Sequence, residues 1–106
     1  MRSNSRQGQG SDSLRKTLQR RDIKIAQRIT EIERKLTALD SQLSGIVRSL
    51  SDPALYSDAV QSAGAGREYH RLSQDISTLT TEWEQLLTEA EEVKATLIES
   101  VVENVL

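Results

Sequence analysis

The chain has 106 residues and a formal charge of −2, with no cysteine, no phenylalanine and one tryptophan. This length allows one domain, the scarcity of aromatic residues argues against a conventional globular core, and the lack of cysteine excludes disulfides and thiolate metal sites. No apolar run approaches the ~18 residues that span a bilayer and no signal-peptide core is present, so we expect a cytoplasmic protein that does not enter a membrane.

The first segment, residues 1–12, is dominated by Ser, Gln, Gly and Arg and has no apolar residue after Met1. Such a composition buries no apolar surface, which predicts a disordered tail or the end of a linker. Residues 13–104 are predicted to form one antiparallel coiled-coil hairpin.

A helix is predicted over about residues 14–50, because an apolar ladder runs along it in alternating steps of four and three residues. Its members are Ile25, Ile29, Ile32, Leu36, Leu39, Leu43, Ile46 and Leu50. This is the 3.5-residue repeat of a coiled-coil seam. Asp22 also falls on the seam, where a carboxylate is costly unless it reaches water or a cation.

Residues 51–66 are predicted to connect two helices. Ser51-Asp52-Pro53 is a helix-start signal, a capping side chain followed by proline, and it predicts a short helical turn over about Pro53–Val60. The glycine-rich run at residues 62–66 predicts a second flexible point. The second long helix is then expected over about residues 67–103.

The second helix carries its own ladder, which mirrors the first. Its members are Ala65, Tyr69, Leu72, Ile76, Leu79, Trp83, Leu86, Ala90, Val93, Leu97 and Val101. Read backwards, it places Ile25 opposite Ala90 and Ile32 opposite Trp83, with the same sum of residue numbers throughout. The predicted fold class is therefore all-α, a two-helix antiparallel hairpin with a short helical turn at its tip.

Charge is divided unevenly between the two arms. Residues 1–36 hold ten bases and four acids (+6), whereas residues 37–106 hold four bases and twelve acids (−8). We expect cross-helix ion pairs that favour the antiparallel register, each contributing only a few tenths of a kcal/mol. The expected pairs are Lys24 with Glu91, Arg21 with Glu92, Arg28 with Glu89, and Arg34 with Glu82.

Catalytic, cofactor and metal-binding constellations are not recognised in the sequence. His70 is the only histidine, and Gly64–Arg67 lacks the ending of a phosphate-binding loop. Trp83 lies on the ladder and is interpreted as a core residue. We therefore expect no enzymatic activity from this chain alone.

Six bases on the first arm are the candidate nucleic-acid-binding residues: Arg15, Lys16, Arg20, Arg21, Lys24 and Arg28. They could contact phosphates along a helix, with a strong dependence on salt. The alternative is that they only complement the acidic second arm.

The motif Leu50-Ser51-Asp52-Pro53-Ala54-Leu55-Tyr56, followed by Glu82-Trp83-Glu84-Gln85-Leu86, carries a resemblance. It resembles the C-terminal coiled-coil domain of the ABC-F family of soluble ABC ATPases, in particular the Uup-like group. That domain has a basic first helix, a Leu-x-Asp-Pro-x-Leu-Tyr connection and a late Trp-x-x-Leu. The similarity covers about residues 14–92, and the chain departs from it in the glycine-rich run after Gln61.

This resemblance implies a non-catalytic accessory domain, separated here from two ATP-binding cassettes that would use ATP and Mg²⁺ in the parent protein. It implies nucleic acid, DNA or ribosomal RNA, or the ribosome itself, as a partner in translation or DNA processes. Weak self-association is a further expectation. The alternative function is a purely structural or protein-interaction coiled coil with no affinity for nucleic acid.

Overall fold

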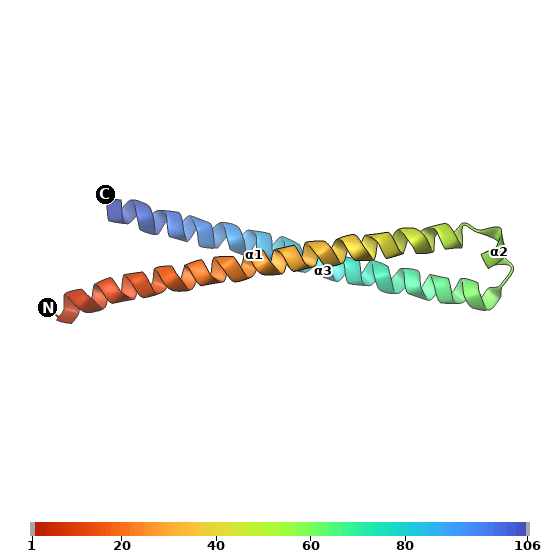
Figure 1. Cartoon of the computed structure of the whole chain (residues 1–106), viewed down its shortest axis with the longest axis horizontal. Helices are drawn as coiled ribbons and strands as arrows, with labels where there is room; N and C mark the ends of the chain where they lie inside the picture. Colours follow the sequence, from red (N-terminus) through yellow and green to blue (C-terminus); the bar gives the residue numbers. More distant parts are fainter. Residues whose placement is uncertain (1, 106) are drawn as a thin grey trace. The chain divides into compact units, whose positions relative to one another are not determined.

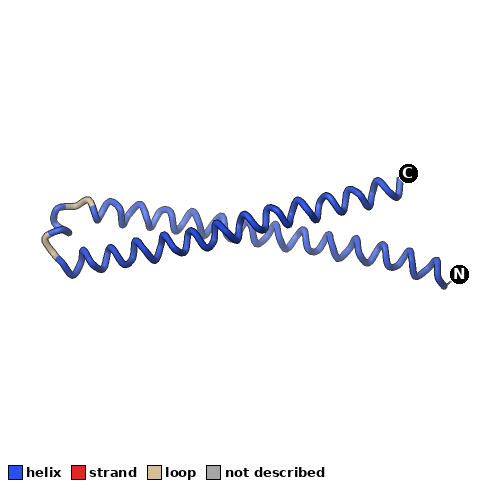
Figure 2. Tube along the Cα trace, turned by 180° about the vertical axis from the view of Figure 1, so that it is seen from behind, coloured by secondary structure: helices blue, strands red, loops and turns tan. Residues whose placement is uncertain are grey.

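The computed structural model describes the backbone of residues 2–105 and the side chains of residues 12–55 and 57–103. Three helices follow one another along the chain (Figure 1): α1 (Arg2–Leu50), α2 (Pro53–Tyr56) and α3 (Ala59–Val105). All regular structure in the described part is helical (Figure 2). The predicted fold class, all-α with two long antiparallel helices and a short helical turn between them, is confirmed.

The chain divides into two compact units, each made from a piece of α1 and a piece of α3. The connection unit is Glu31–Glu84 and contains α2; the terminal unit combines Met1–Thr30 with Gln85–Leu106. In each unit the two helical pieces run in opposite directions, as the sequence colours in Figure 1 show.

The core of the connection unit is the middle of the predicted seam. Ile32 and Leu72 are completely buried. The other ladder residues of this unit are half-buried, except Tyr69, whose exposed fraction is 37%. Burying large aliphatic side chains stabilises by about 1.5–3 kcal/mol each before entropy is subtracted, so this seam holds the unit together.

The terminal unit continues the same repeat, but polar residues enter its seam. Ile25 and Val93 are buried, with exposed fractions of 6% and 4%. Asp22, predicted to face Val93, is half-buried, as is Arg15 seven residues earlier. A seam with polar residues at such positions gains less from burial than an all-aliphatic one.

Two aspartates shape the connection. The Asp52 carboxylate accepts a hydrogen bond from the backbone N–H of Ala54 at 3.0 Å, which caps α2 ahead of Pro53. Asp58 does the same for α3, accepting from the N–H groups of Val60 and Gln61 at 3.0 and 3.1 Å. Such caps satisfy the free N–H groups at a helix start.

The second cap explains a difference from the sequence prediction. The short turn ends at Tyr56, and α3 begins at Ala59 rather than near residue 67. Gly64 and Gly66 therefore lie inside a helix, and neither adopts a positive φ. The cap at Asp58 and the alanines at 59, 63 and 65 favour helix strongly enough to include both glycines.

At the other end of the chain, α1 is helical from Arg2, whereas the sequence predicted a tail over residues 1–12. The side chains of residues 1–11 lie outside the described part, and the division of the chain into tail and hairpin stays a prediction. None of the helices, over the residues that the structure describes, is both long and apolar enough to cross a membrane.

Candidate nucleic-acid interface

The six candidate bases all lie on the α1 piece of the terminal unit, but on different faces of the helix. Heptad letters assigned from the seam place Asp22 at a and Ile25 at d in α1, and Ala90 at a and Val93 at d in α3. Arg15 then falls on the seam itself. Arg21 and Arg28 fall at g, beside it, while Lys16, Arg20 and Lys24 occupy the outer positions b, f and c.

Arg15 is poorly placed for a ligand. Its side chain is half-buried, and its Nε is buried without a hydrogen-bond partner among the described residues. A guanidinium held partly in a seam offers fewer donors to a phosphate, so we interpret Arg15 as a seam residue whose stem packs while its end reaches outward.

Arg21 is already engaged within the hairpin. Its Nη2 donates to Oε1 of Glu89 on α3 at 2.7 Å, and the two side chains are 54% and 41% exposed. The sequence predicted Glu92 as the partner, and that pairing is wrong. Glu89 lies at g of α3, so the long arginine side chain bridges the two g positions that flank the seam on the same side.

The other predicted ion pairs, of Lys24, Arg28 and Arg34, stay predictions. Arg28 is half-buried and has an interaction of its own. It is therefore the second of the six bases, after Arg21, that is engaged within the protein.

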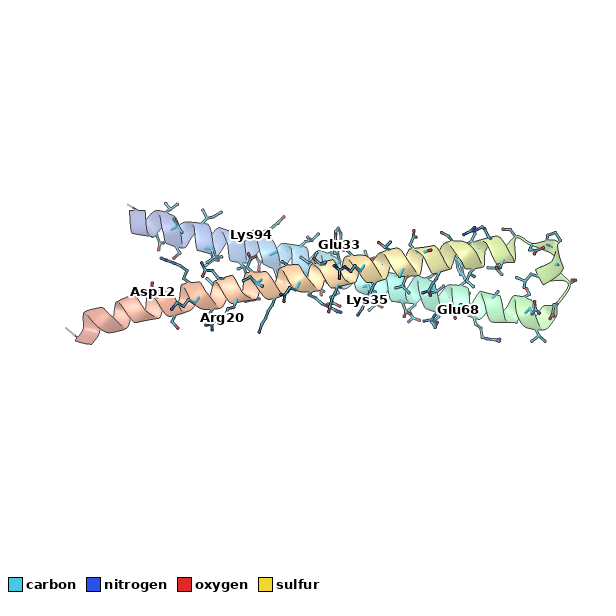
Figure 3. The ribbon with its side chains drawn as sticks, in the orientation of Figure 1. Asp12, Arg20, Glu33, Lys35, Glu68 and Lys94 are labelled. Atoms are coloured by element: carbon cyan, nitrogen blue, oxygen red, sulfur yellow. The ribbon has the colours of Figure 1, made fainter. Side chains whose placement is uncertain are left out.

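Three bases extend outward: Lys16, Arg20 and Lys24 are exposed. Arg20 and Lys24 line a shallow depression along α1 together with Thr17 and Arg21. Figure 3 shows the labelled Arg20 side chain on the edge of α1 that points away from α3. We call Arg20, Arg21 and Lys24 the basic strip. These three basic side chains lie together on one surface of α1.

Two further grooves lie in the connection unit. One is lined by Lys35, Ala38, Leu39, Asp75, Thr78 and Leu79, and the other by Glu33, Leu36, Thr37, Thr80 and Trp83. Both are open and sit on opposite flanks of the seam. The Nε1 atom of Trp83 is buried and has no hydrogen-bond partner among the described side chains. The residue is half-buried on the ladder, as expected for a core residue.

Acidic and histidine side chains do not converge into a metal-binding group of three or more anywhere in the described part of the chain. His70 is exposed, with its ring edge-on to Tyr69 at 5.7 Å between centroids.

One charged cluster on α3 shifts the pKa values of two of its members, Glu68 and Arg71. The guanidinium of Arg71 binds both carboxylate oxygens of Glu68, with Nε to Oε2 at 3.1 Å, and also reaches Oδ2 of Asp75 at 3.1 Å. The hydrogen bonds from Arg71 lower the pKa of the Glu68 carboxyl, and the same bonds raise that of Arg71. This is a helix-stabilising pairing at i, i+3 and i, i+4 spacing rather than a binding site.

Comparison with known proteins gives a match to a protein family. Residues 20–88 match the ABC transporter C-terminal domain family. This is well over half of the chain and includes the first ladder, the connection and the second ladder as far as Leu86. No curated protein matches the chain, and no solved structure matches it. The chain therefore belongs to the ABC transporter C-terminal domain family.

Proposed function

We infer that the chain is an accessory C-terminal domain of an ABC protein, because it belongs to this family. We propose that the parent is an ABC-F ATPase of the Uup-like group and that this domain binds nucleic acid, DNA or ribosomal RNA, through the basic strip on α1. The motif Leu50–Tyr56 supports the parentage. The observation that supports the binding is the convergence of Arg20, Arg21 and Lys24 on one shallow surface.

The surroundings of the strip favour phosphate over other ligands. Residues 12–30 of α1 hold six bases and two acids, a charge of +4 within a stretch of ~28 Å at 1.5 Å per residue. This stretch contains no aromatic residue on which the nucleobases of a bound nucleic acid could stack. The expected contact is electrostatic and largely indifferent to nucleotide sequence.

Salt dependence tests the proposal. Affinity of the full chain for a short DNA duplex and for a duplex of RNA is measured at about 50 and 200 mM salt. With two to four phosphate contacts, the affinity should fall by about 10- to 100-fold over this range. Binding that ignores salt, or no binding at 50 mM, would overturn the proposal.

Matched variants locate the contact. Replacing Arg20 and Lys24 with Gln should weaken binding at least tenfold and reduce the salt slope by about 2. Arg21 is left in place because its pairing with Glu89 belongs to the fold. Replacing Arg48 and Arg67 with Gln removes the same charge from exposed positions of the connection unit and should leave affinity nearly unchanged.

A second candidate is a purely structural or protein-interaction hairpin without affinity for nucleic acid. The Arg21–Glu89 ion pair favours this second candidate, because one basic residue of the strip binds a carboxylate of α3 within the hairpin. A chain that binds neither duplex at the lower salt while remaining helical would support this candidate.

A further inference from the structure

Arg21 takes part both in the basic strip and in an ion pair across the seam. It lines the shallow depression on α1 together with Thr17, Arg20 and Lys24. The same guanidinium donates from Nη2 to Oε1 of Glu89 on α3 at 2.7 Å. Carboxylate and phosphate oxygens accept hydrogen bonds from a guanidinium in the same way, so Glu89 occupies a donor that a phosphate would use.

Among the described acids of the terminal unit, Glu89 is the one that contacts the strip. Asp22 is half-buried at a in the seam, and exposed Glu92 lies at c of α3, one row further out on the same flank as Glu89. Glu103 shares the g position with Glu89 but lies two heptads further along α3, about 21 Å away at 1.5 Å per residue. The charge that opposes the strip at contact distance is therefore that of Glu89.

The ion pair is part of the folded hairpin, but it is weak enough to exchange partners. Both side chains reach solvent, and an ion pair in such a setting shifts an equilibrium by about two- to fivefold. A nucleic acid brings neighbouring phosphates to Arg20 and Lys24 at the same time, so one of its phosphates can displace the carboxylate. We propose that Glu89 competes with phosphate for Arg21, and that the hairpin thereby lowers the affinity of its own nucleic-acid contact.

This inference rests on the proposed function and describes how that site is restrained. In the free chain the charge of Arg21 is compensated by Glu89, whereas Arg20 and Lys24 are exposed on the outer rows of α1. A duplex that binds the strip must do without Arg21 or break the ion pair. The wild type should therefore use about two phosphate contacts here, and removal of the carboxylate should add a third.

Glu89→Gln provides the first test, with a short DNA duplex as the probe. At about 50 mM salt the variant should bind about two- to fivefold more tightly than the wild type. Between about 50 and 200 mM salt, the slope of log affinity against log salt should become steeper by about 0.9, because one more phosphate is neutralised. The gain in affinity should therefore shrink as salt rises. Circular dichroism should show unchanged helix content, since the pair is exposed.

Glu92→Gln is the matched control. Glu92 is exposed on the same flank of the same helix, and it is the partner that the sequence predicted for Arg21. Its substitution removes the same charge without releasing Arg21, which binds Glu89. The salt slope of this variant should stay within about 0.3 of the wild-type value.

A double-variant cycle tests whether the effect passes through Arg21. Arg21→Gln alone and Arg21→Gln combined with Glu89→Gln should have the same salt slope, because neither protein has a guanidinium to release. The slope is the readout, since a change in affinity alone would also follow from plain repulsion between the carboxylate and the duplex.

The outcomes separate this inference from the proposed function. If neither the wild type nor Glu89→Gln binds the duplex at about 50 mM salt, the proposed function fails and the inference fails with it. If the wild type binds with the expected salt dependence and Glu89→Gln has the same slope, the inference alone is overturned. It is also overturned if the slope steepens equally in Glu92→Gln or in the Arg21→Gln background, or if Glu89→Gln loses helix content.

Discussion

The two units share one pair of helices and one heptad repeat, but their seams differ. In the connection unit the seam positions are aliphatic or aromatic, and Ile32 and Leu72 are completely buried. In the terminal unit the a positions of α1 include Arg15 and Asp22, and the d position after Leu97 is Ser100. The same periodicity thus encodes one seam optimised for burial and another interrupted by polar groups.

The difference shows that one heptad repeat can provide a buried core in one unit and an exposed binding surface in the other. Most of the large apolar side chains that are exposed in the described part lie in the terminal unit, where the proposed nucleic-acid contact also lies. Charged residues divide almost evenly between the two units. The connection unit contributes the dry core and the capped turn. We expect the terminal unit to open more readily than the connection unit, because local stability follows buried apolar contact.

The largest expected effect comes from truncating the core of the connection unit. Ile32→Ala removes most of a completely buried side chain and should lower the free energy of unfolding by about 3 kcal/mol. Urea denaturation measures it. Val47→Ala, on the same helix with 46% of Val47 exposed, is the control and should change stability by less than about 0.5 kcal/mol. Equal losses in the two variants would contradict the assigned core.

Replacing the polar seam residue of the terminal unit should have the opposite sign. Asp22→Leu puts an aliphatic side chain at a half-buried a position across from buried Val93 and should stabilise by about 1 kcal/mol. Hydrogen exchange of α1 amides in the terminal unit should slow accordingly. Asp40→Leu, at an exposed e position, is the control and should add nothing. A destabilised Asp22→Leu would mean that the carboxylate holds a cation or water that the seam needs.

Glycine substitutions in the connection unit should give a smaller gain. A Cβ built at Gly45 or at Gly66 meets no atom within 4 Å, and both glycines are helical. Gly45→Ala and Gly66→Ala should each stabilise by about 0.5–1 kcal/mol, because alanine loses less backbone entropy. Ala63→Gly, at an exposed position of α3, should cost a similar amount. If either alanine variant were less stable than the wild type, the space beside that glycine would have to be occupied in the folded protein.

The fold could be predicted because a mirrored seam leaves few alternatives. A ladder such as Ile25 to Leu50 buries its apolar face only against a partner, and the second ladder provides one within the same chain. The bounds of the connection were less accessible, since Asp58 reads as an ordinary loop acid until its two hydrogen bonds to backbone N–H groups are seen. Glycine at 64 and 66 favoured a loop, and the cap outweighed that preference.

The candidate site was only partly accessible from sequence. The periodicity places all six bases on one helix, but it does not say which of them the hairpin itself engages. Arg21 was expected to bind Glu92 and binds Glu89, because the reach of a guanidinium exceeds one helical turn. The heptad positions could have indicated this pairing, since Arg21 and Glu89 both lie at g. The constant sum of residue numbers, from which Glu92 was predicted, applies only to residues that face one another in the seam.

The smallest effect concerns a titration in the connection unit. Arg71 lowers the pKa of the Glu68 carboxyl by hydrogen bonding to its charged form, so the folded value lies below the unfolded one. The pairing therefore contributes stability above the unfolded pKa, and this contribution is lost as pH falls through the folded pKa. Carboxyl chemical shifts should titrate at lower pH in the wild type than in Arg71→Gln, where the value returns toward normal. Identical curves for Glu68 in the two proteins would mean that the bidentate contact does not persist in solution.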